Sequence, residues 1–256
     1  MNCKYRALRH LLRAQRRVAV AFSGGADSAL LLKVACAVLG LARVTAFHAA
    51  SSLLPAGETD LAVATARRFG CRFQAVHLQP LRWRAFVANP PDRCYHCKKK
   101  IYQHLLAHPA LGGAVLLDGT NADDLSAHRP GLRAIAELGV LSPLAVVGLS
   151  KQEIRQLGRR ISVPVWNAPS SSCLATRIAT HEPISLKKIQ LVQHCEDVLR
   201  GLGFVGTRVR LAGNDATIGI LATDFDMLNN RDISTVKRIL LEFNLCFRGF
   251  APLRRP

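Results

Sequence analysis

Short, largely apolar runs alternate with helical patterns through the first two thirds of the chain. The runs predict buried strands over residues 18–22, 44–49, 72–78 and 114–117. Between them, apolar side chains recur at helical spacing over residues 30–39, 58–69 and 98–107. Strand–helix alternation of this kind predicts a parallel sheet with helices on both faces, which binds its ligands at the carboxyl ends of the strands.

The pattern changes near residue 180. Before that point, Ser150 and Glu153 form a capping-box sequence that opens a helix ending near residue 160, and residues 163–166 are predicted to form a last strand. Beyond it, the sequence predicts helices over 185–202 and 233–243, strands over 208–211 and 216–221, and a short tail. We therefore expect an α/β domain over residues 1–180 and a smaller α+β domain over residues 181–256.

A glycine-rich loop, Ser23-Gly24-Gly25-Ala26-Asp27-Ser28, joins the first predicted strand to the first helix. Such a loop directs backbone N–H groups and a helix N-terminus at one point, which makes an anion site. It lacks the lysine of a Walker A loop and the three glycines of the dinucleotide fingerprint. It resembles the PP-loop of the ATP pyrophosphatase superfamily, whose fold is of the adenine nucleotide alpha hydrolase type and whose members split ATP into AMP and pyrophosphate.

That chemistry needs donors on the departing pyrophosphate and a carboxylate that holds Mg²⁺. Gly24, Gly25 and Ser28 are the candidate donors, Ser23 adds a hydroxyl group, and Asp27 is the candidate Mg²⁺ ligand. The alternative is a glycine turn with a helix cap at Asp27 or Ser28.

A second polar segment, residues 118–124, directly follows the strand expected to end at residue 117. Parallel strands place their carboxyl ends at one edge of a sheet, so Gly119, Asn121, Asp123 and Asp124 should reach the edge that carries the glycine loop. Two acids and an amide there suit magnesium or substrate binding. The alternative is an Asx-rich turn that caps the next helix.

The charge balance favours anionic partners such as nucleotides, nucleic acid or phosphate esters. The chain has 35 basic and 17 acidic residues, for a net charge of +18. An arginine-rich surface without a specific partner explains the excess equally well. The acid-free N-terminus leads straight into the first strand, so we interpret it as a basic helix and not as a targeting peptide. With no apolar run of the roughly 18 residues that span a bilayer, we expect a cytoplasmic protein without a membrane partner.

The eight cysteines are expected to be thiols, metal ligands or catalysts and not disulfides. Cys94 and Cys97 form one C-x-x-C pair, and Cys173 lies near Arg177, a neighbour that favours thiolate. No second C-x-x-C pair exists, which disfavours a Cys₄ zinc site. Three thiolates on an iron–sulfur cubane would leave its fourth iron open. The other cysteines are expected to be small buried hydrophobes: Cys3, Cys36, Cys71, Cys195 and Cys246.

Taken together, the motifs resemble the LarE family of ATP-dependent sulfurtransferases over nearly the whole chain. Besides the glycine loop, they are Arg93-Cys-Tyr-His-Cys-Lys98, Gly119-Thr-Asn-Ala-Asp-Asp124, Arg129-Pro-Gly-Leu-Arg133, Leu141-Ser-Pro-Leu144 and Cys173-Leu-Ala-Thr-Arg-Ile178. The family sulfurates pyridinium-3,5-biscarboxylic acid mononucleotide for the nickel-pincer nucleotide. The resemblance therefore implies adenylation of a substrate carboxylate, and then sulfur transfer with release of AMP.

The cysteine content separates two mechanisms known in this family. Members with only the last cysteine give up its sulfur, whereas members with all three hold a [4Fe-4S] cluster that carries an extra sulfide. The resemblance thus implies that Cys94, Cys97 and Cys173 bind a cluster and that Cys173 is a ligand and not a sacrificial donor.

The resemblance also implies roles for several charged residues. Lys98 and Arg177 are candidates to neutralise the carboxylate or the adenylate, or they are solvated charges. Glu196, Arg208 and Arg210 fall where the family has catalytic and substrate-phosphate contacts.

Two other functions remain open at this point. A PP-loop tRNA thiolase shares the loop and often the three cysteines, and the positive charge keeps nucleic acid as a possible partner. A non-catalytic nucleotide-binding or metal-storage protein would bind ATP without releasing pyrophosphate. The small second domain is a plausible surface for homo-oligomer assembly.

Overall fold

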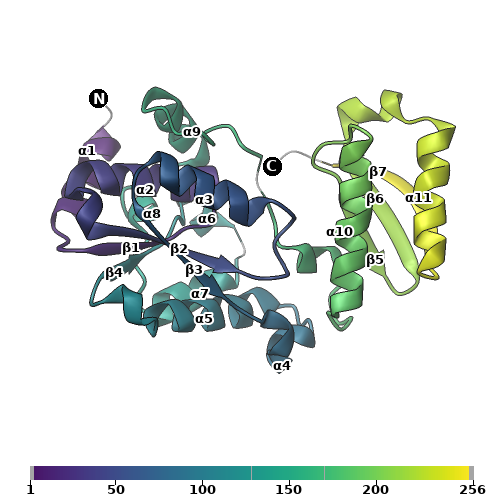
Figure 1. Ribbon diagram of the computed structural model, residues 1–256, viewed down its shortest axis with the longest axis horizontal. Helices are drawn as coiled ribbons and strands as arrows, with labels where there is room; N and C mark the ends of the chain where they lie inside the picture. The colour runs from purple at the N-terminus through teal and green to yellow at the C-terminus, as the bar shows by residue number, and fades with distance from the viewer. Residues whose placement is uncertain (1–2, 128, 170, 254–256) are drawn as a thin grey trace. The chain divides into compact units, whose positions relative to one another are not determined.

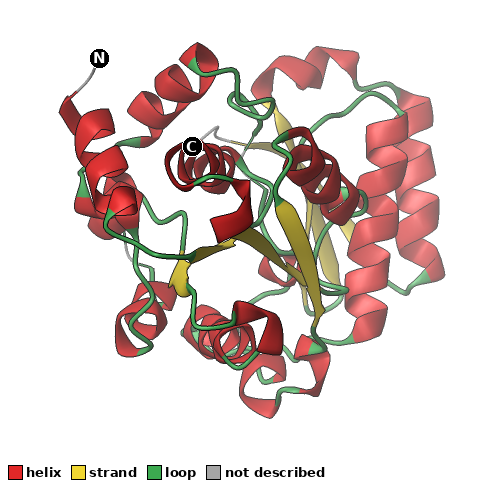
Figure 2. Ribbon diagram, turned by 60° about the vertical axis from the view of Figure 1, so that its left-hand side comes forward, coloured by secondary structure: helices red, strands yellow, loops and turns green. Residues whose placement is uncertain are grey.

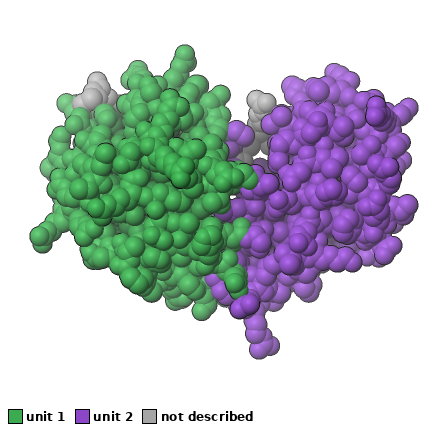
Figure 3. All heavy atoms as spheres, viewed as in Figure 1, with its two compact units in different colours: residues 1–51, 57–79, 92–168 green, residues 52–56, 80–91, 169–256 purple. Residues whose placement is uncertain are grey.

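The computed structural model describes residues 3–127, 129–169 and 171–253. The chain divides into two compact units (Figure 3). The first comprises residues 1–51, 57–79 and 92–168, and the second comprises residues 52–56, 80–91 and 169–256. The domain boundary expected near residue 180 stays a prediction.

The first unit contains the predicted parallel sheet. Its strands are β1 (Val18–Ala21), β2 (Val44–Ala50), β3 (Arg72–His77) and β4 (Val115–Leu117), in the order β3-β2-β1-β4. All neighbouring strands run parallel, which confirms the predicted α/β class. Leu141 extends the sheet by one parallel bridge to Leu117.

Helices cover both faces of this sheet (Figures 1 and 2). In Figure 1, α2 (Ala26–Leu39) and α9 (Lys151–Arg160) lie above the strands, and α5 (Arg93–Leu106) and α7 (Gly131–Glu137) lie below. The remaining helices of the unit are α1 (Cys3–Arg13), α3 (Glu58–Arg68), α6 (Ala122–Ser126) and α8 (Pro143–Val146). Most of α2 is buried because it contacts the sheet as well as α1 and α9, so its sequence is apolar on nearly every side.

The strand order creates a switch point between β1 and β4. The chain steps from β1 to β2 and β3 in one direction, and then returns to the other side of β1 to form β4. At such a reversal the connections leave the sheet in opposite directions and open a crevice at the carboxyl ends of the two strands. The glycine loop and the segment 118–124 both begin there.

The strand predicted over residues 163–166 is wrong. The chain turns back across the end of α9 instead: Val163 N–H donates to the Gly158 carbonyl oxygen at 2.8 Å, and Trp166 N–H donates to the Val163 carbonyl oxygen at 3.2 Å. Trp166 packs on Gly158, where an added Cβ would lie 3.0 Å from the Trp166 Cβ. Pro164 has no N–H group to give to a sheet, which opposes a strand within the sheet.

The second unit is the small α+β structure that the sequence predicts, with one strand more. It contains α4 (Arg84–Val87), α10 (Leu186–Gly201), β5 (Arg208–Ala212), β6 (Asp215–Leu221), α11 (Asn230–Glu242) and β7 (Cys246–Leu253). The sheet order is β5-β6-β7, antiparallel and then parallel. The predicted tail is therefore an edge strand. Its alternation of apolar and polar positions is interrupted by a shift in its register with β6, between Ala216 and Thr217, and by Pro252.

The cysteines outside the three candidates divide into two groups. Cys36, Cys71 and Cys195 are buried, as predicted. Burial and the charge of Glu196 raise the pKa of Cys195 to about 12. The same prediction is wrong for Cys3 and Cys246, which are exposed because they begin α1 and the edge strand β7.

Within the described part of the chain, no helix combines the length and the apolar character that a membrane span requires.

The capping box of α9 yields a stability prediction. Ser150 Oγ accepts from Glu153 N–H at 3.2 Å, and a Glu153 carboxylate oxygen accepts from Ser150 N–H at 2.9 Å. We expect Ser150→Ala to lower the free energy of unfolding by about 1 kcal/mol, measured by urea denaturation. Gln152→Ala, an exposed change on the same helix, is the control, and equal effects of both would contradict a capping role.

Candidate functional site

The glycine loop is folded tightly against α3. Gly24 has a φ of 88°, and a Cβ on it would lie 3.2 Å from the Ala62 Cβ. Ser23 Oγ lies 3.1 Å from Ser28 Oγ and accepts from Gly25 N–H at 3.3 Å. The loop therefore needs glycine at position 24 both for the backbone conformation and for contact with α3.

The loop delivers the chain into the N-terminus of α2. Gly25 is the N-cap residue and contributes no side-chain hydrogen bond to the first turn. The N–H groups of that turn and the positive end of the helix dipole thus remain available to an anion.

The segment after β4 touches the start of α2. A Cβ on Gly119 would lie 3.0 Å from Ser28 N and 3.2 Å from Ser28 Cα, both backbone atoms. Asn121 is buried, and its Nδ2 donates to Asp27 Oδ2 at 3.1 Å. The structure therefore brings together Asp27, Ser28, Gly119 and Asn121, which the sequence had assigned to one edge.

Asp124 is part of a capping box at the start of α6, which agrees with the helix-capping alternative for residues 118–124. Asn121 N–H donates to Asp124 Oδ2 at 3.3 Å, and Asp124 N–H donates to Asn121 Oδ1 at 3.1 Å. The other oxygen, Oδ1, is buried and accepts no hydrogen bond from the residues that the structure describes. Its partners are charged groups, with Arg129 Nη2 at 3.0 Å and Lys151 Nζ at 3.7 Å.

Asp27 lies in an environment that disfavours its negative charge. Burial raises its pKa, and the neighbouring charge of Asp124 adds to this effect, against the hydrogen bond from Asn121. A cation bound at these carboxylates would relieve the repulsion, so the donors fit a hard cation such as Mg²⁺ in kind. Asp123 binds the start of α9 instead, because its Oδ2 accepts a hydrogen bond from the backbone N–H of Lys151 at 2.8 Å.

Asp118 accepts hydrogen bonds from three side chains of the site, although the sequence did not single it out as a site residue. Its Oδ1 accepts from Ser142 Oγ at 2.6 Å, and its Oδ2 accepts from Thr120 Oγ1 at 2.7 Å and from the Tyr102 hydroxyl at 3.1 Å. Lys98 Nζ lies 3.7 Å from Oδ2. An acid directly after a buried strand was the available signal for this residue.

Lys98 reaches this carboxylate from α5. Gly131 on α7 makes room for it, since a Cβ there would lie 2.9 Å from Lys98 Cδ. Burial lowers the pKa of Lys98, and the charges of Asp118 and Asp124 oppose that shift. A half-buried ammonium group facing acids can balance the negative charge of a bound anion, whereas a solvated surface lysine would not be held in this way.

Cys94 and Cys97 lie near the N-terminus of α5, three residues apart and therefore on one side of the helix. Cys94 is exposed and Cys97 is half-buried. Tyr95, between them, fixes this turn to α7: its hydroxyl donates to Glu137 Oε2 at 2.8 Å, and Arg133 Cζ lies 3.7 Å from its ring centroid.

The remaining predicted residues belong to the second unit. Arg177 is buried there and forms a bidentate ion pair with Glu196 of α10: Nε donates to Oε1 at 2.9 Å, and Nη2 donates to Oε2 at 3.2 Å. Its Nη1 donates to the Ser172 and Cys173 carbonyl oxygens at 3.1 Å and 3.4 Å. Arg177 is therefore no solvated charge, and it fixes the backbone beside Cys173.

Glu196 also ties α10 to β5, because its Oε1 accepts from Val209 N–H at 3.0 Å. Arg208 and Arg210 flank Val209 and share the opposite face of the strand, the first half-buried and the second exposed. Burial lowers the pKa of Arg208, and the charges of Arg177 and Arg210 add to that effect. Adjacent like charges of this kind favour an anionic ligand.

The three candidate cluster ligands are divided between the units. Cys94 and Cys97 belong to the first and Cys173 to the second. Over residues 3–127, 129–169 and 171–253, no group of three or more His, Cys, Asp or Glu side chains is arranged to hold a metal ion. The donors fit an iron–sulfur cluster in kind and in exposure, since none of the three is buried.

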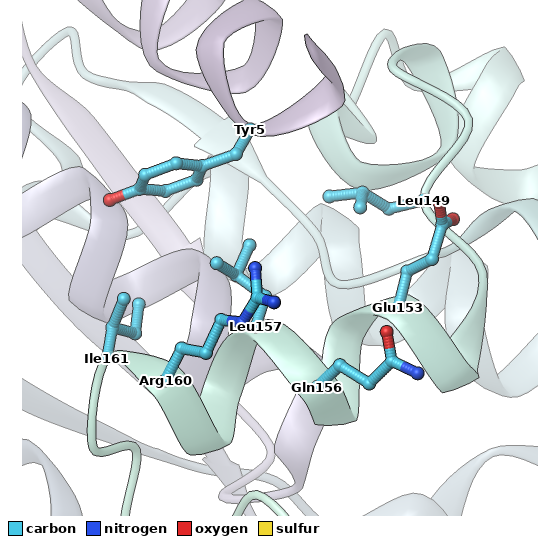
Figure 4. Close-up of a pocket in the computed structure, with 7 residues that line it drawn as sticks. All are labelled: Tyr5, Leu149, Glu153, Gln156, Leu157, Arg160 and Ile161. Atoms are coloured by element: carbon cyan, nitrogen blue, oxygen red, sulfur yellow. The ribbon is translucent and has the colours of Figure 1, made fainter. Parts of the chain in front are cut away.

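A cavity of about 200 Å³ lies apart from these residues, between α1 and α9 (Figure 4). It is lined by Tyr5, Leu149, Glu153, Gln156, Leu157, Arg160 and Ile161. The hydrogen bond from Lys4 to Glu153, at 2.7 Å, lowers the pKa of this carboxyl group to about 2. No residue that the sequence assigned to the site lines this cavity.

The four-stranded sheet and the glycine loop at its switch point define a PP-loop-like α/β protein. No family model matches the chain. It is 38% identical over 219 residues to an uncharacterized protein of Synechocystis, covering 85% of the chain and 81% of that protein. It is 36% identical over 224 residues to the pyridinium-3,5-bisthiocarboxylic acid mononucleotide synthase of Lactiplantibacillus plantarum, covering 86% and 81%. The chain belongs to the LarE family.

A third relative extends this comparison to an archaeon. An uncharacterized protein of Methanocaldococcus jannaschii is 26% identical over 224 residues, covering 87% of the chain and 84% of that protein.

The contact between Gly119 and Ser28 can be tested by adding one methyl group. Because a Cβ at Gly119 meets backbone and not a movable side chain, we expect Gly119→Ala to lower the free energy of unfolding by about 1–3 kcal/mol. Gly201→Ala is the control, since a Cβ there meets no atom of the described residues within 4 Å. Chemical denaturation in which Gly119→Ala is as stable as the control would contradict the close contact.

The buried pair in the second unit gives a larger expected effect. Glu196→Ala leaves Arg177 and Val209 N–H without their acceptor, so we expect a loss of about 3–5 kcal/mol in the free energy of unfolding. Asp197→Ala, which breaks only the exposed pair with Arg200, should cost much less. Thermal and urea unfolding measure both variants, and similar losses would argue against a structural role for the buried pair.

Proposed function

We propose that the chain is an ATP-dependent sulfurtransferase that adenylates a carboxylate of pyridinium-3,5-biscarboxylic acid mononucleotide and converts it to a thiocarboxylate. The family and the name of its Lactiplantibacillus relative support the substrate. The observation that carries the ATP half of the proposal is the contact of Gly119 with Ser28, which joins the glycine loop to the acidic segment after β4.

The glycine loop would hold the β and γ phosphates of ATP. Gly24, Gly25 and Ser28 would direct N–H and hydroxyl donors at the pyrophosphate as negative charge develops on it. A substrate carboxylate oxygen attacks the α phosphorus, the bond from that phosphorus to the bridging oxygen breaks, and pyrophosphate leaves. The product is an acyl-adenylate. Its carboxylate oxygen, a poor leaving group by itself, is now part of AMP, which is a good leaving group.

Asp27 and Asp124 would hold Mg²⁺ through their carboxylate oxygens. The raised pKa of Asp27, caused first by burial and then by the charge of Asp124, supports this assignment. Asp124 Oδ1 is paired with Arg129 and Lys151, so a carboxylate oxygen is already oriented toward positive charge. When bound, the ion would neutralise charge on the departing pyrophosphate. Lys98 would balance the remaining negative charge, because it is already positioned against Asp118.

Cys94, Cys97 and Cys173 would hold a [4Fe-4S] cluster. When bound, it supplies an extra sulfide as the sulfur donor, so that Cys173 keeps its own sulfur. Tyr95 and Arg133 would hold the C-x-x-C turn, and Arg177 would hold the backbone at Cys173.

Arg208 and Arg210 would bind the phosphate of the substrate mononucleotide. Their shared face of β5 is held in register by the bond from Val209 N–H to Glu196. Glu196 and Arg177 are therefore positioning residues in this proposal.

Anaerobic reconstitution with iron and sulfide tests the proposal. We expect the loaded protein to release AMP and pyrophosphate and to form thiocarboxylate over several turnovers. Asp27→Asn should lose at least about tenfold in pyrophosphate release while keeping its iron, because a neutral amide binds Mg²⁺ more weakly than a carboxylate does.

The cluster is tested separately from the ATP reaction. Cys94→Ser should lose iron and sulfur transfer but retain ATP binding, whereas Cys246→Ser, an exposed cysteine outside the three, should keep its iron. Wild-type protein that binds no iron, or that ends with dehydroalanine at Cys173 after one turnover, would contradict the cluster. Thiolation of tRNA in place of the pyridinium substrate would support the rival enzyme.

A further inference from the structure

His48 is a buried histidine that the mechanism does not use. It lies at the carboxyl-terminal half of β2, with 1% of its surface exposed. Its Nδ1 lies 2.9 Å from the Phe22 carbonyl oxygen, and its Nε2 lies 3.1 Å from Thr59 Oγ1. Both ring nitrogens are therefore engaged, one by the residue that precedes the glycine loop and one by the first turn of α3.

These partners determine which nitrogen carries the proton. A carbonyl oxygen only accepts, so Nδ1–H donates to Phe22. A neutral ring then leaves Nε2 as an acceptor for the Thr59 hydroxyl group. Burial lowers the pKa of His48, which favours this neutral form. The Phe73 ring stacks on the imidazole with its centroid at 5.8 Å and so fixes the plane of the ring.

The two contacts of His48 form part of a closed chain around the glycine loop. Phe22 is held from both sides, because its N–H donates to the Phe47 carbonyl oxygen at 2.7 Å. Thr59 and Ala62 lie three residues apart and share one face of α3. Ala62 on that face contacts Gly24. The same face of α3 thus meets the loop at its entrance, through His48, and at its first glycine.

We propose that His48 is a positioning residue: by bridging Phe22 to Thr59, it holds the glycine loop in the conformation that binds a nucleoside triphosphate. It touches no phosphate itself. It sets the distance between the end of β1 and α3, and so the backbone conformation of Gly24 and Gly25 at the proposed phosphate site. This inference rests on the proposed ATP site.

The hydroxyl group of Thr59 offers the sharpest test because it can be removed without a change of shape. Thr59→Val leaves Nε2 without its donor, whereas Thr59→Ser keeps the donor. We expect Thr59→Val to raise the Kd for ATP by about tenfold or more, and Thr59→Ser to stay within about twofold of wild type. Calorimetric titration well below the unfolding temperature separates this effect from a general loss of stability, which would leave Kd unchanged.

Variants of His48 supply the second comparison. His48→Phe removes both bridging nitrogens, and His48→Gln keeps one donor and one acceptor. We expect His48→Gln to bind ATP more tightly than His48→Phe, and His10→Gln on the exposed side of α1 to match wild type. Equal Kd values for wild type, Thr59→Val and His48→Phe would overturn the inference while leaving the ATP site intact.

Two measurements test His48 without nucleotide. Long-range ¹H–¹⁵N spectra should find the proton on Nδ1, and amide exchange at Gly24 and Gly25 should be faster in Thr59→Val than in Thr59→Ser. A proton on Nε2, or equal exchange rates in the two variants, would overturn the inference. If wild type binds no ATP, the proposed function fails, and these two results still decide the role of His48.

Discussion

The contact between the segment after β4 and the start of α2 is the constraint on which the candidate site depends. Gly119 lies against the Ser28 backbone so closely that no side chain fits between them. This contact exists because the strand order reverses beside β1, which sends the glycine loop and the acidic segment to the same crevice. Asp27, Asn121 and Asp124 are neighbours as a result, although nearly one hundred residues separate the first from the others.

A buried ion pair has the corresponding role in the second unit. Arg177 and Glu196 form two hydrogen bonds with each other. Arg177 Nη1 also donates to the backbone at Cys173, and Glu196 Oε1 also accepts from Val209 N–H on β5. Removal of either partner would leave a charge in the interior, which explains why both are present together. The pair links the cysteine segment to the strand that carries Arg208 and Arg210, so a structural ion pair organises two candidate binding groups.

Much of the fold could be predicted from the sequence because its signals are local. The apolar runs, the glycine loop and the Ser150 capping box each specify an element through nearby residues. The errors occur where a distant contact decides. Residues 163–166 are apolar enough for a strand, yet Pro164 and the packing of Trp166 on Gly158 turn the chain. Residues 246–253 form a strand only because β6 offers an edge.

The same distinction holds for the site. The spacing of Ser23 to Ser28 predicts a phosphate loop from adjacent residues. The position of Asp118 after a strand could also have selected that acid, but its hydrogen bonds from Ser142 and Tyr102 depend on the fold. His48 lies in an apolar strand and looks like an ordinary core residue until Phe22 and Thr59 are found at its two nitrogens. Polar groups that act through partners far along the chain need the folded structure before they can be recognised.

We propose that the glycine loop at the β1–β4 switch point holds the phosphates of ATP. Titration of the ¹⁵N-labelled protein with Mg²⁺-pyrophosphate, followed by amide chemical shifts, measures this binding. We expect saturable shifts at Gly24, Gly25 and Ser28, with Gly201 unaffected. Shifts confined to other residues, or none at millimolar pyrophosphate, would contradict it.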